Sequence, residues 1–144
     1  MIRDWQNLLK NKLEEAIENN LPQNLKIPVE IPVTIENYNL RHALGAYLIV
    51  YKGSTFTHKD LKTIIAQNRD LEFGIIIAAR YRTDFTPEDY LDFAIKSLSG
   101  IETDSKRTDR KIYCSNDEWI KEENGIWWYA ATMIVPAEFF EGVG

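Results

Sequence analysis

The sequence contains one cysteine, two histidines and no long apolar run, and each scarcity excludes a class of protein. A single thiol, Cys114, permits no internal disulfide, which fits a chain made in a reducing cytoplasm. No stretch reaches the roughly 18 apolar residues that span a bilayer, and no basic segment followed by an apolar core opens the chain, so we expect neither a membrane span nor a signal peptide. The net charge of −5 offers no basic footprint for nucleic acid.

Residues that support catalysis or cofactor binding are also few. His42 and His58 share no metal-ligand spacing with each other or with Cys114, so a zinc site of histidine and cysteine is not expected. The glycines stand alone, without a phosphate-binding pattern, and we expect no cofactor. A hydrolase that uses Cys114 with His42 or His58 is an open alternative, because catalytic partners need only be close in space. The favoured interpretation is a protein that is not an enzyme.

Two helices are predicted in a chain long enough for one hydrophobic core, and we expect residues 1–144 to form a single domain. Apolar residues at helical spacing predict an amphipathic helix over Ile2–Asn19, which Pro22 ends. Thr86 as N-cap, Pro87 at the first helical position and two following acids predict the start of the second helix. Gly100 is placed to end it.

Extended segments fill most of the remaining chain. Gly53 and Ser54 are expected to end the second predicted strand, and Asn124-Gly125 to form the turn of a closing hairpin. Phe56–Gln67 fits either a helical turn or an early start of the next strand. The proline-rich Pro22–Pro32 should run extended, and the tail Pro136–Gly144 should be loosely held. The predicted strands are Val33–Tyr38, Leu44–Lys52, Arg69–Arg80, Lys111–Glu122 and Gly125–Val135.

Two of these strands, Arg69–Arg80 and Gly125–Val135, are apolar on both faces. Such a pattern is typical of a strand that is covered on both sides. Since two helices normally cover one face of a sheet, we expect another protein chain to cover the other. The order helix-strand-strand-strand-helix-strand-strand predicts an α+β fold, with a mostly antiparallel sheet of four to five strands and two helices packed on one face.

Six residues are candidates for contact with another chain, because arginine, tyrosine and tryptophan are common interface anchors. Ordinary strand-end charges are the alternative interpretation for the arginines. A different alternative takes Trp127 and Trp128 as a stacking platform for nucleic-acid bases or carbohydrate, although no basic residues interleave with them. The six candidates are Arg69, Arg80, Tyr81, Arg82, Trp127 and Tyr129.

Motifs along most of the chain resemble those of one known family, the small tail protein of Mu-like phage and prophage tail clusters, which is related in fold to phage tail-terminator proteins. A "VYRGS"-like turn, a "QDRxLEF"-like strand start and a "GxWxY"-like strand start occur in the family's order after the N-terminal helix. The proline-rich segment and the polar loop before the hairpin match only loosely. The motifs here are Gly45–Ser54 (GAYLIVYKGS), Gln67–Phe73 (QNRDLEF), Ile75–Arg80 (IIIAAR), Asp117–Trp119 and Glu123–Tyr129 (ENGIWWY).

The resemblance implies a single tail-terminator-like domain without catalytic residues or a cofactor. It implies a structural protein that forms a ring-like homo-oligomer, a hexamer by the same resemblance, at the end of the tail tube. Its partners would be further copies of itself, the tail tube or sheath, and head–tail connector proteins, with no specific nucleic-acid binding and no membrane. The implied location is the virion tail, after assembly in the cytoplasm of the bacterial host.

Overall fold

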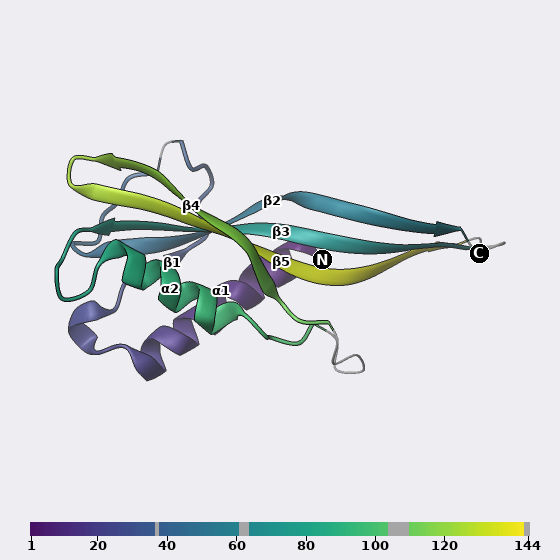
Figure 1. The fold of residues 1–144 in the computed structure, drawn as a ribbon, viewed down its shortest axis with the longest axis horizontal. Coiled ribbons are helices and arrows are strands. Elements are labelled where there is room, and N and C mark those ends of the chain that lie inside the picture. Colours follow the sequence, from purple (N-terminus) through teal and green to yellow (C-terminus); the bar gives the residue numbers. More distant parts are fainter. Residues whose placement is uncertain (37, 61–63, 104–109, 143–144) are drawn as a thin grey trace.

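The computed structural model describes residues 1–36, 38–60, 64–103 and 110–142. Within them, two α-helices pack on one face of a five-stranded sheet, and three of the strands continue beyond the helices as a long ribbon (Figure 1). This arrangement confirms the predicted α+β fold, including the order of helices and strands and the placement of both helices on one face.

The first helix, α1 (Ile2–Asn20), forms as its apolar spacing predicts. It buries one stripe, Leu9, Leu13 and Ile17, and leaves its acidic and basic residues in solvent. The helix ends at Leu21, whose extended backbone precedes Pro22. A short 3₁₀ helix, η1 (Gln23–Leu25), follows, so the expectation of a wholly extended proline-rich segment is wrong at these residues.

The second helix, α2 (Pro87–Leu98), begins with the N-cap that the sequence predicts. The Thr86 hydroxyl accepts a hydrogen bond from the Asp89 amide at 3.2 Å, and the Asp89 carboxylate accepts one from the Thr86 amide at 2.8 Å. This capping box satisfies two amides that have no partner within the helix. Gly100 adopts a left-handed conformation, with φ of 86°, one residue after the C-cap Ser99.

The sheet has the order β1-β2-β3-β5-β4, and only the β1–β2 pair is parallel. The long strand β3 lies at the centre and pairs with β5 from Ile64–Gly142 to Arg80–Ile126. Asn124 and Gly125, with φ of 56° and 80°, form the two-residue turn between β4 and β5, as predicted. The strands are β1 (Val29–Glu30), β2 (Gly45–Asp60), β3 (Ile64–Arg80), β4 (Tyr113–Glu123) and β5 (Ile126–Gly142).

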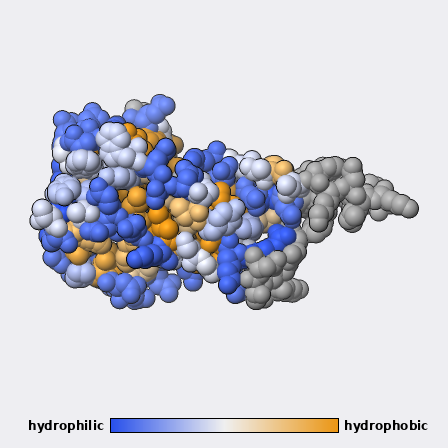
Figure 2. All heavy atoms as spheres, viewed as in Figure 1, coloured by the Kyte–Doolittle hydropathy of each residue, from blue (hydrophilic) through white to orange (hydrophobic). Residues whose placement is uncertain are grey.

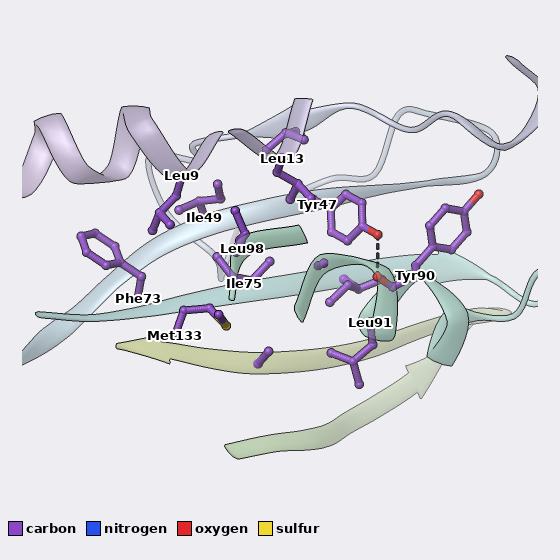
Figure 3. Close-up of a cluster of buried hydrophobic side chains, with 14 of the residues drawn as sticks. Leu9, Leu13, Tyr47, Ile49, Phe73, Ile75, Tyr90, Leu91, Leu98 and Met133 are labelled. Carbon is purple, nitrogen blue, oxygen red and sulfur yellow. Dashed lines mark hydrogen bonds between the residues drawn. The ribbon is translucent and has the colours of Figure 1, made fainter. Parts of the chain in front are cut away.

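The hydrophobic core lies between the helices and the sheet (Figure 3). Leu9 and Leu13 of α1 and Leu91 and Leu98 of α2 point toward the sheet, whose strands supply the opposing side chains. The Tyr47 hydroxyl, within this core, donates a hydrogen bond to the Tyr90 carbonyl at 2.5 Å. The opposing sheet residues are Tyr47, Ile49, Leu71, Phe73, Ile75, Ile77, Ala79, Ala131, Met133 and Val135.

The second face of the sheet has a smaller apolar cluster that the chain covers itself. Ala46, Leu48 and Ile76 are buried beneath a loop between β1 and β2, which contributes Ile35, Tyr38 and Leu40, and beside Trp128. The Tyr38 hydroxyl donates a hydrogen bond to the Glu30 carboxylate and holds the loop in place. The expectation that another chain must cover this face is therefore wrong for its centre, because Ile35, Tyr38 and Leu40 supply the cover.

Three strand predictions require correction. Val33–Tyr38 is not a strand, since its described residues belong to the covering loop, and the edge strand is instead Val29–Glu30. Gly53 does not end β2 but lies at a register shift between Tyr51 and Gly53. The tail Pro136–Gly144 was expected to be loosely held, but β5 pairs with β3 as far as Gly142, so the expectation is wrong up to that residue. Residues 143–144 lie outside the described chain.

The ambiguous segment Phe56–Gln67 resolves as two strands. Its first part completes β2 and its last part begins β3 at Ile64, which confirms the early strand start and excludes a helical turn in the described residues. Residues 61–63 lie outside the described chain. The tolerance of β5 for Pro136 follows from its position, since β4 pairs with β5 only as far as Ile134 and proline is confined to strand edges.

Candidate interaction surface

Residues 55–60 of β2, 64–70 of β3 and 136–142 of β5 form a three-stranded ribbon, here called the arm. Seven residues of extended strand reach about 23 Å, and Figure 1 shows the arm pointing away from the helices. In the described residues, β1 pairs with β2 only as far as Leu48, and β4 pairs with β5 only as far as Ile134. Both edges of the arm therefore present backbone groups that another chain can contact.

Arg69 contacts four residues at the root of the arm. Its guanidinium lies 5.2 Å from the ring centroid of Phe56, directly across from it in the β2–β3 register. Arg69 Nε donates a hydrogen bond to Ser54 at 3.0 Å, and Nη2 contacts the Tyr51 hydroxyl at 3.4 Å. Nη1 lies 3.6 Å from the sulfur of Met1, which places Arg69 and Phe56 on the face that carries the helices.

Four aromatic residues gather at the opposite end of that same face, and we call them the aromatic patch: Tyr81, Trp119, Trp127 and Tyr129. The rings of Tyr81 and Trp127 lie 6.0 Å apart, and Trp119 is paired with Tyr129 across β4 and β5. Trp127 and Tyr129 are two residues apart on β5 and so share a face. Tyr81 is 54% exposed and Trp119 55%, values far above those of core aromatics.

An acidic side chain from α2 borders the aromatic patch. The Tyr129 hydroxyl donates a 2.5 Å hydrogen bond to Oε1 of Glu88. Desolvation, and next the hydrogen bond to Glu88, raise the pKa of Tyr129 to about 12. The same hydrogen bond lowers the pKa of the Glu88 carboxyl. The carboxylate stays charged at neutral pH and gives this end of the molecule an acidic rim.

The remaining predicted interface arginines differ in their surroundings. Arg82 forms a two-pronged ion pair with Asp84, with Nη2–Oδ2 and Nε–Oδ1 distances of 2.7 and 3.1 Å, and Nη1 reaches the Asn24 carbonyl at 3.4 Å. Arg82 therefore ties the loop after β3 to η1 within its own chain. Arg80 is exposed at the end of β3. The structure thus brings Tyr81, Trp127 and Tyr129 together and places Arg69 at the far end of the sheet.

Both ends of the sheet carry a net negative charge. The arm, residues 55–60, 64–70 and 136–142, contains two basic and four acidic residues, a net charge of −2. Tyr113–Glu123, the strand that carries Trp119, contains four acidic residues and one lysine, a net charge of −3. The arm and the opposite end of the sheet are therefore both acidic, as is the chain as a whole.

Trp127 and Trp128 do not form a shared stacking platform. As neighbours in β5 they point to opposite faces, with Trp127 in the aromatic patch and Trp128 against Tyr38 at a ring distance of 6.3 Å. Lys121 lies over the Trp128 ring at 5.1 Å. A hollow of about 310 Å³ opens beside this loop, lined by Glu30, Pro32, Val33, Thr34, Tyr38, Asn39 and Arg41.

Cys114 and His42 each contact a backbone group of their own segment. The Cys114 thiol hydrogen-bonds to the Asn116 carbonyl at 3.4 Å, and burial raises its pKa, which favours the thiol over the nucleophilic thiolate. Nδ1 of His42 accepts a hydrogen bond from the Leu44 amide at 3.1 Å. The side chain of His58 lies outside the described part of the chain.

Side chains that ligate metals are dispersed in the described residues, and no three of His, Cys, Asp or Glu gather into a candidate metal site there. Neither described helix combines the length and the apolar character needed to cross a bilayer. The space-filling view in Figure 2 shows apolar residues over the middle of the body, with hydrophilic residues around them.

Two surface aromatics, Trp119 and Phe56, were not among the sequence candidates. Phe56 is 48% exposed beside Arg69, and Trp119 extends the aromatic patch. Both lie on the helix-bearing face because of a register shift in the strand pair of each. The shift between Tyr51 and Gly53 in β2 precedes Phe56, and the shift between Trp119 and Lys121 in β4 follows Trp119. Only the glycine before Phe56 is a sequence signal of such a shift.

These features define a class: an α+β protein with a two-layer body and a projecting β arm. The chain belongs to the Gp37 protein family, a phage-associated family whose model matches residues 15–142. It is thus a phage-related protein. A comparison with curated protein sequences gave no match.

Proposed function

We propose that this chain is a structural, non-enzymatic component of a phage or phage-derived tail, a tail terminator or completion protein that forms a ring at the end of the tail tube. Membership of a phage-associated family supports the setting. The similarity of its strand motifs to those of Mu-like tail proteins supports the specific role. Its partners in this proposal are further copies of itself, the tube or sheath, and connector proteins.

The arm is the observation that carries the proposal. A β ribbon is stable in water when three or more strands share a hydrophobic face or when it packs against a helix. The helices pack on the body, while Thr55, Phe56, Thr57 and Asn68 at the root of the arm are exposed. A partner surface that packs against the arm would supply the missing cover, and a repeated structural assembly provides such a surface in every subunit.

Ring formation requires two different surfaces on each subunit, since a head-to-tail contact joins one patch to another patch on the next copy. The arm and the aromatic patch are two such surfaces. They lie at opposite ends of the long strands, where a contact with one neighbour leaves the other surface available (Figure 1).

The proposal is tested by polymerising tube protein from the same phage with and without this chain. We expect the chain to shorten and narrow the distribution of tube lengths in electron micrographs, and to decorate one end of each tube. Glu15→Gln, on the exposed face of α1, is the matched control and should act as the unchanged protein does.

Tubes of unchanged length, with none of the chain bound to them in sedimentation, would contradict a role at the tube end. Binding of the chain along the whole tube would contradict the terminator role and would indicate a protein associated with the tube or sheath.

A further inference from the structure

We infer that neighbouring copies of this chain join through the two edges of the arm, with the β5 edge of one copy pairing as a strand with the β2 edge of the next. The partner is a second copy of this chain, and the contact is made between backbones. This inference rests on the proposed self-assembly. It places both joining surfaces on the arm, which leaves the aromatic patch for the tube or a connector.

The direction of the backbone groups in the central strand β3 is the first step. Along an antiparallel strand, successive residues direct their N–H and C=O groups to opposite sides. The Arg80 amide, at the end of β3, donates a hydrogen bond to the Leu44 carbonyl on the β2 side at 2.9 Å. Even-numbered residues of β3 therefore face β2, and odd-numbered residues face β5.

The same alternation identifies the outward groups of both arm edges. Odd-numbered residues of β5 from Ala137 to Glu141 lie opposite odd-numbered residues of β3, so residues 136, 138, 140 and 142 direct their backbone groups outward. Pro136, which has no N–H, occupies an outward position and costs no bond to β3. In β2, Thr55 and Thr57 lie opposite even-numbered residues of β3, so residues 56, 58 and 60 face outward.

The two open edges match each other in level, length and direction. Thr55 and Pro136 flank the same residue of β3 at the root of the arm, and Asp60 and Glu141 flank another toward its tip. Both β2 and β5 run antiparallel to β3, so they run parallel to each other (Figure 1). A rotation that carries one arm beside the next therefore aligns β5 with β2 as a parallel pair.

This matching selects a second copy as the partner. Repeating the rotation pairs both edges of every arm, as a closed head-to-tail assembly requires. A foreign strand on one edge leaves the other edge open, and so does a symmetric dimer through two β5 edges or two β2 edges.

Charge also separates these pairings. Residues 55–60 of β2 contain one lysine and one aspartate, a net charge of 0, whereas residues 136–142 of β5 contain two glutamates, a net charge of −2. Pairing of two β5 edges brings four carboxylates together, and like charges on paired strands are destabilising. The β5–β2 pairing places the acidic strand beside a neutral one.

The edges of the body are less suited to strand addition than those of the arm. Register shifts at Cys114/Asn116 and at Trp119/Lys121 interrupt β4, and β1 has two residues. Bulges and short edge strands are features that block pairing with another chain. Beyond Gly53 the register of the arm is uninterrupted on both sides of β3 in the described residues.

Two proline variants that block opposite edges test the inference. Glu138→Pro removes an outward amide from the β5 edge, and His58→Pro removes one from the β2 edge. Neither amide faces β3, so folding should be retained, as circular dichroism would verify. We expect each variant to associate at least about 10-fold more weakly than the unchanged chain, because a backbone hydrogen bond is lost and the proline ring obstructs the approaching strand. An equimolar mixture should form a 1:1 heterodimer, because one intact edge remains on each variant.

Glu138→Thr and His58→Thr are the matched controls, since threonine suits a strand and keeps the amide. Both should assemble as the unchanged chain does, in light scattering up to about 1 mM subunit. Hydrogen exchange on the unchanged chain gives a second measurement. The amides of residues 56, 58, 138 and 140 should exchange at least about 10-fold more slowly in the assembly than in the dilute monomer.

The outcomes separate the inference from the proposed function. If the unchanged chain stays monomeric in this range and on tubes, the proposed assembly fails and the inference with it. If the unchanged chain assembles but the proline variants assemble equally well, or the edge amides exchange at the monomer rate, the inference alone is wrong. Loss of assembly in the threonine controls, or a mixture of proline variants without heterodimer, would also overturn it. Should a proline variant fail to fold, hydrogen exchange on the unchanged chain decides.

Discussion

Replacing Phe73 by alanine tests the stability of the folded chain separately from its assembly. Phe73 is fully buried in β3, and its ring lies 5.5 Å from that of Tyr51 in the core between helices and sheet. Truncation of a buried phenylalanine to alanine costs about 3–5 kcal/mol, since the surrounding core relaxes only in part. Domains of this size unfold with a free energy of only about 5–15 kcal/mol, so the variant should melt roughly 10 °C lower.

The assay is urea unfolding followed by tryptophan fluorescence, at about 1 μM chain so that self-association contributes nothing to stability. Phe56→Ala is the control, because it makes the same change on the neighbouring strand at an exposed position. We expect it to cost at most about 1 kcal/mol, the value of an exposed cation–π contact with Arg69. Equal losses for the two variants, or a loss for Phe73→Ala below about 1 kcal/mol, would refute the assigned core.

Three further changes test local features. Thr86→Ala removes the capping box of α2 and should lower the free energy of unfolding by about 1 kcal/mol in urea titration, and an unchanged midpoint would contradict the cap. Gly125→Ala places a β-carbon at φ of 80° and should cost about 1 kcal/mol, which a thermal melt detects. NMR titration should show the Tyr129 ring ionising near pH 12, and Glu88→Gln should lower that pKa. Because the folded state holds the Tyr129 proton more tightly, this contribution to stability is present below about pH 10 and is lost as pH rises toward 12. A Tyr129 pKa near 10 in both proteins would contradict the Tyr129–Glu88 hydrogen bond.

Local signals predicted much of the fold. Thr86 and Pro87 gave the start of α2, and Asn124-Gly125 gave the turn of the closing hairpin, because each depends on backbone chemistry within a few residues. The two-faced apolar pattern correctly indicated the central strands β3 and β5. The same pattern also led us to expect that another chain covers the second face of the sheet. That expectation was wrong at the centre of this face, because Tyr38 and its loop fold back over the sheet.

The parts that escaped prediction depend on nonlocal register. Counting back from the turn, an uninterrupted hairpin would pair Trp119 with Ala130 and direct it to the second face. The shift between Trp119 and Lys121 pairs it with Tyr129 instead and brings it into the aromatic patch. The shift at Gly53 likewise moves Phe56 to the helix side, opposite Arg69. β1, with two residues, is too short for any periodicity.

Among the predicted interface residues, the structure groups Tyr81 with Trp127 and Tyr129. Tyr81 is distant from the other two in sequence, but the end of β3 lies beside the start of β5. Arg82 makes an internal ion pair that sequence alone does not reveal, since its partner Asp84 is equally consistent with a solvent-exposed loop.

The mass of the assembled protein tests the central claim most directly, namely that the chain carries two different contact surfaces and assembles with further copies of itself. Native mass spectrometry across a concentration series, alone and with tail tubes, gives that mass in multiples of the 16.8 kDa subunit. We predict one closed species with a fixed number of copies. A subunit that stays single at every concentration and binds no tube, or a symmetric dimer that grows no further, would contradict it.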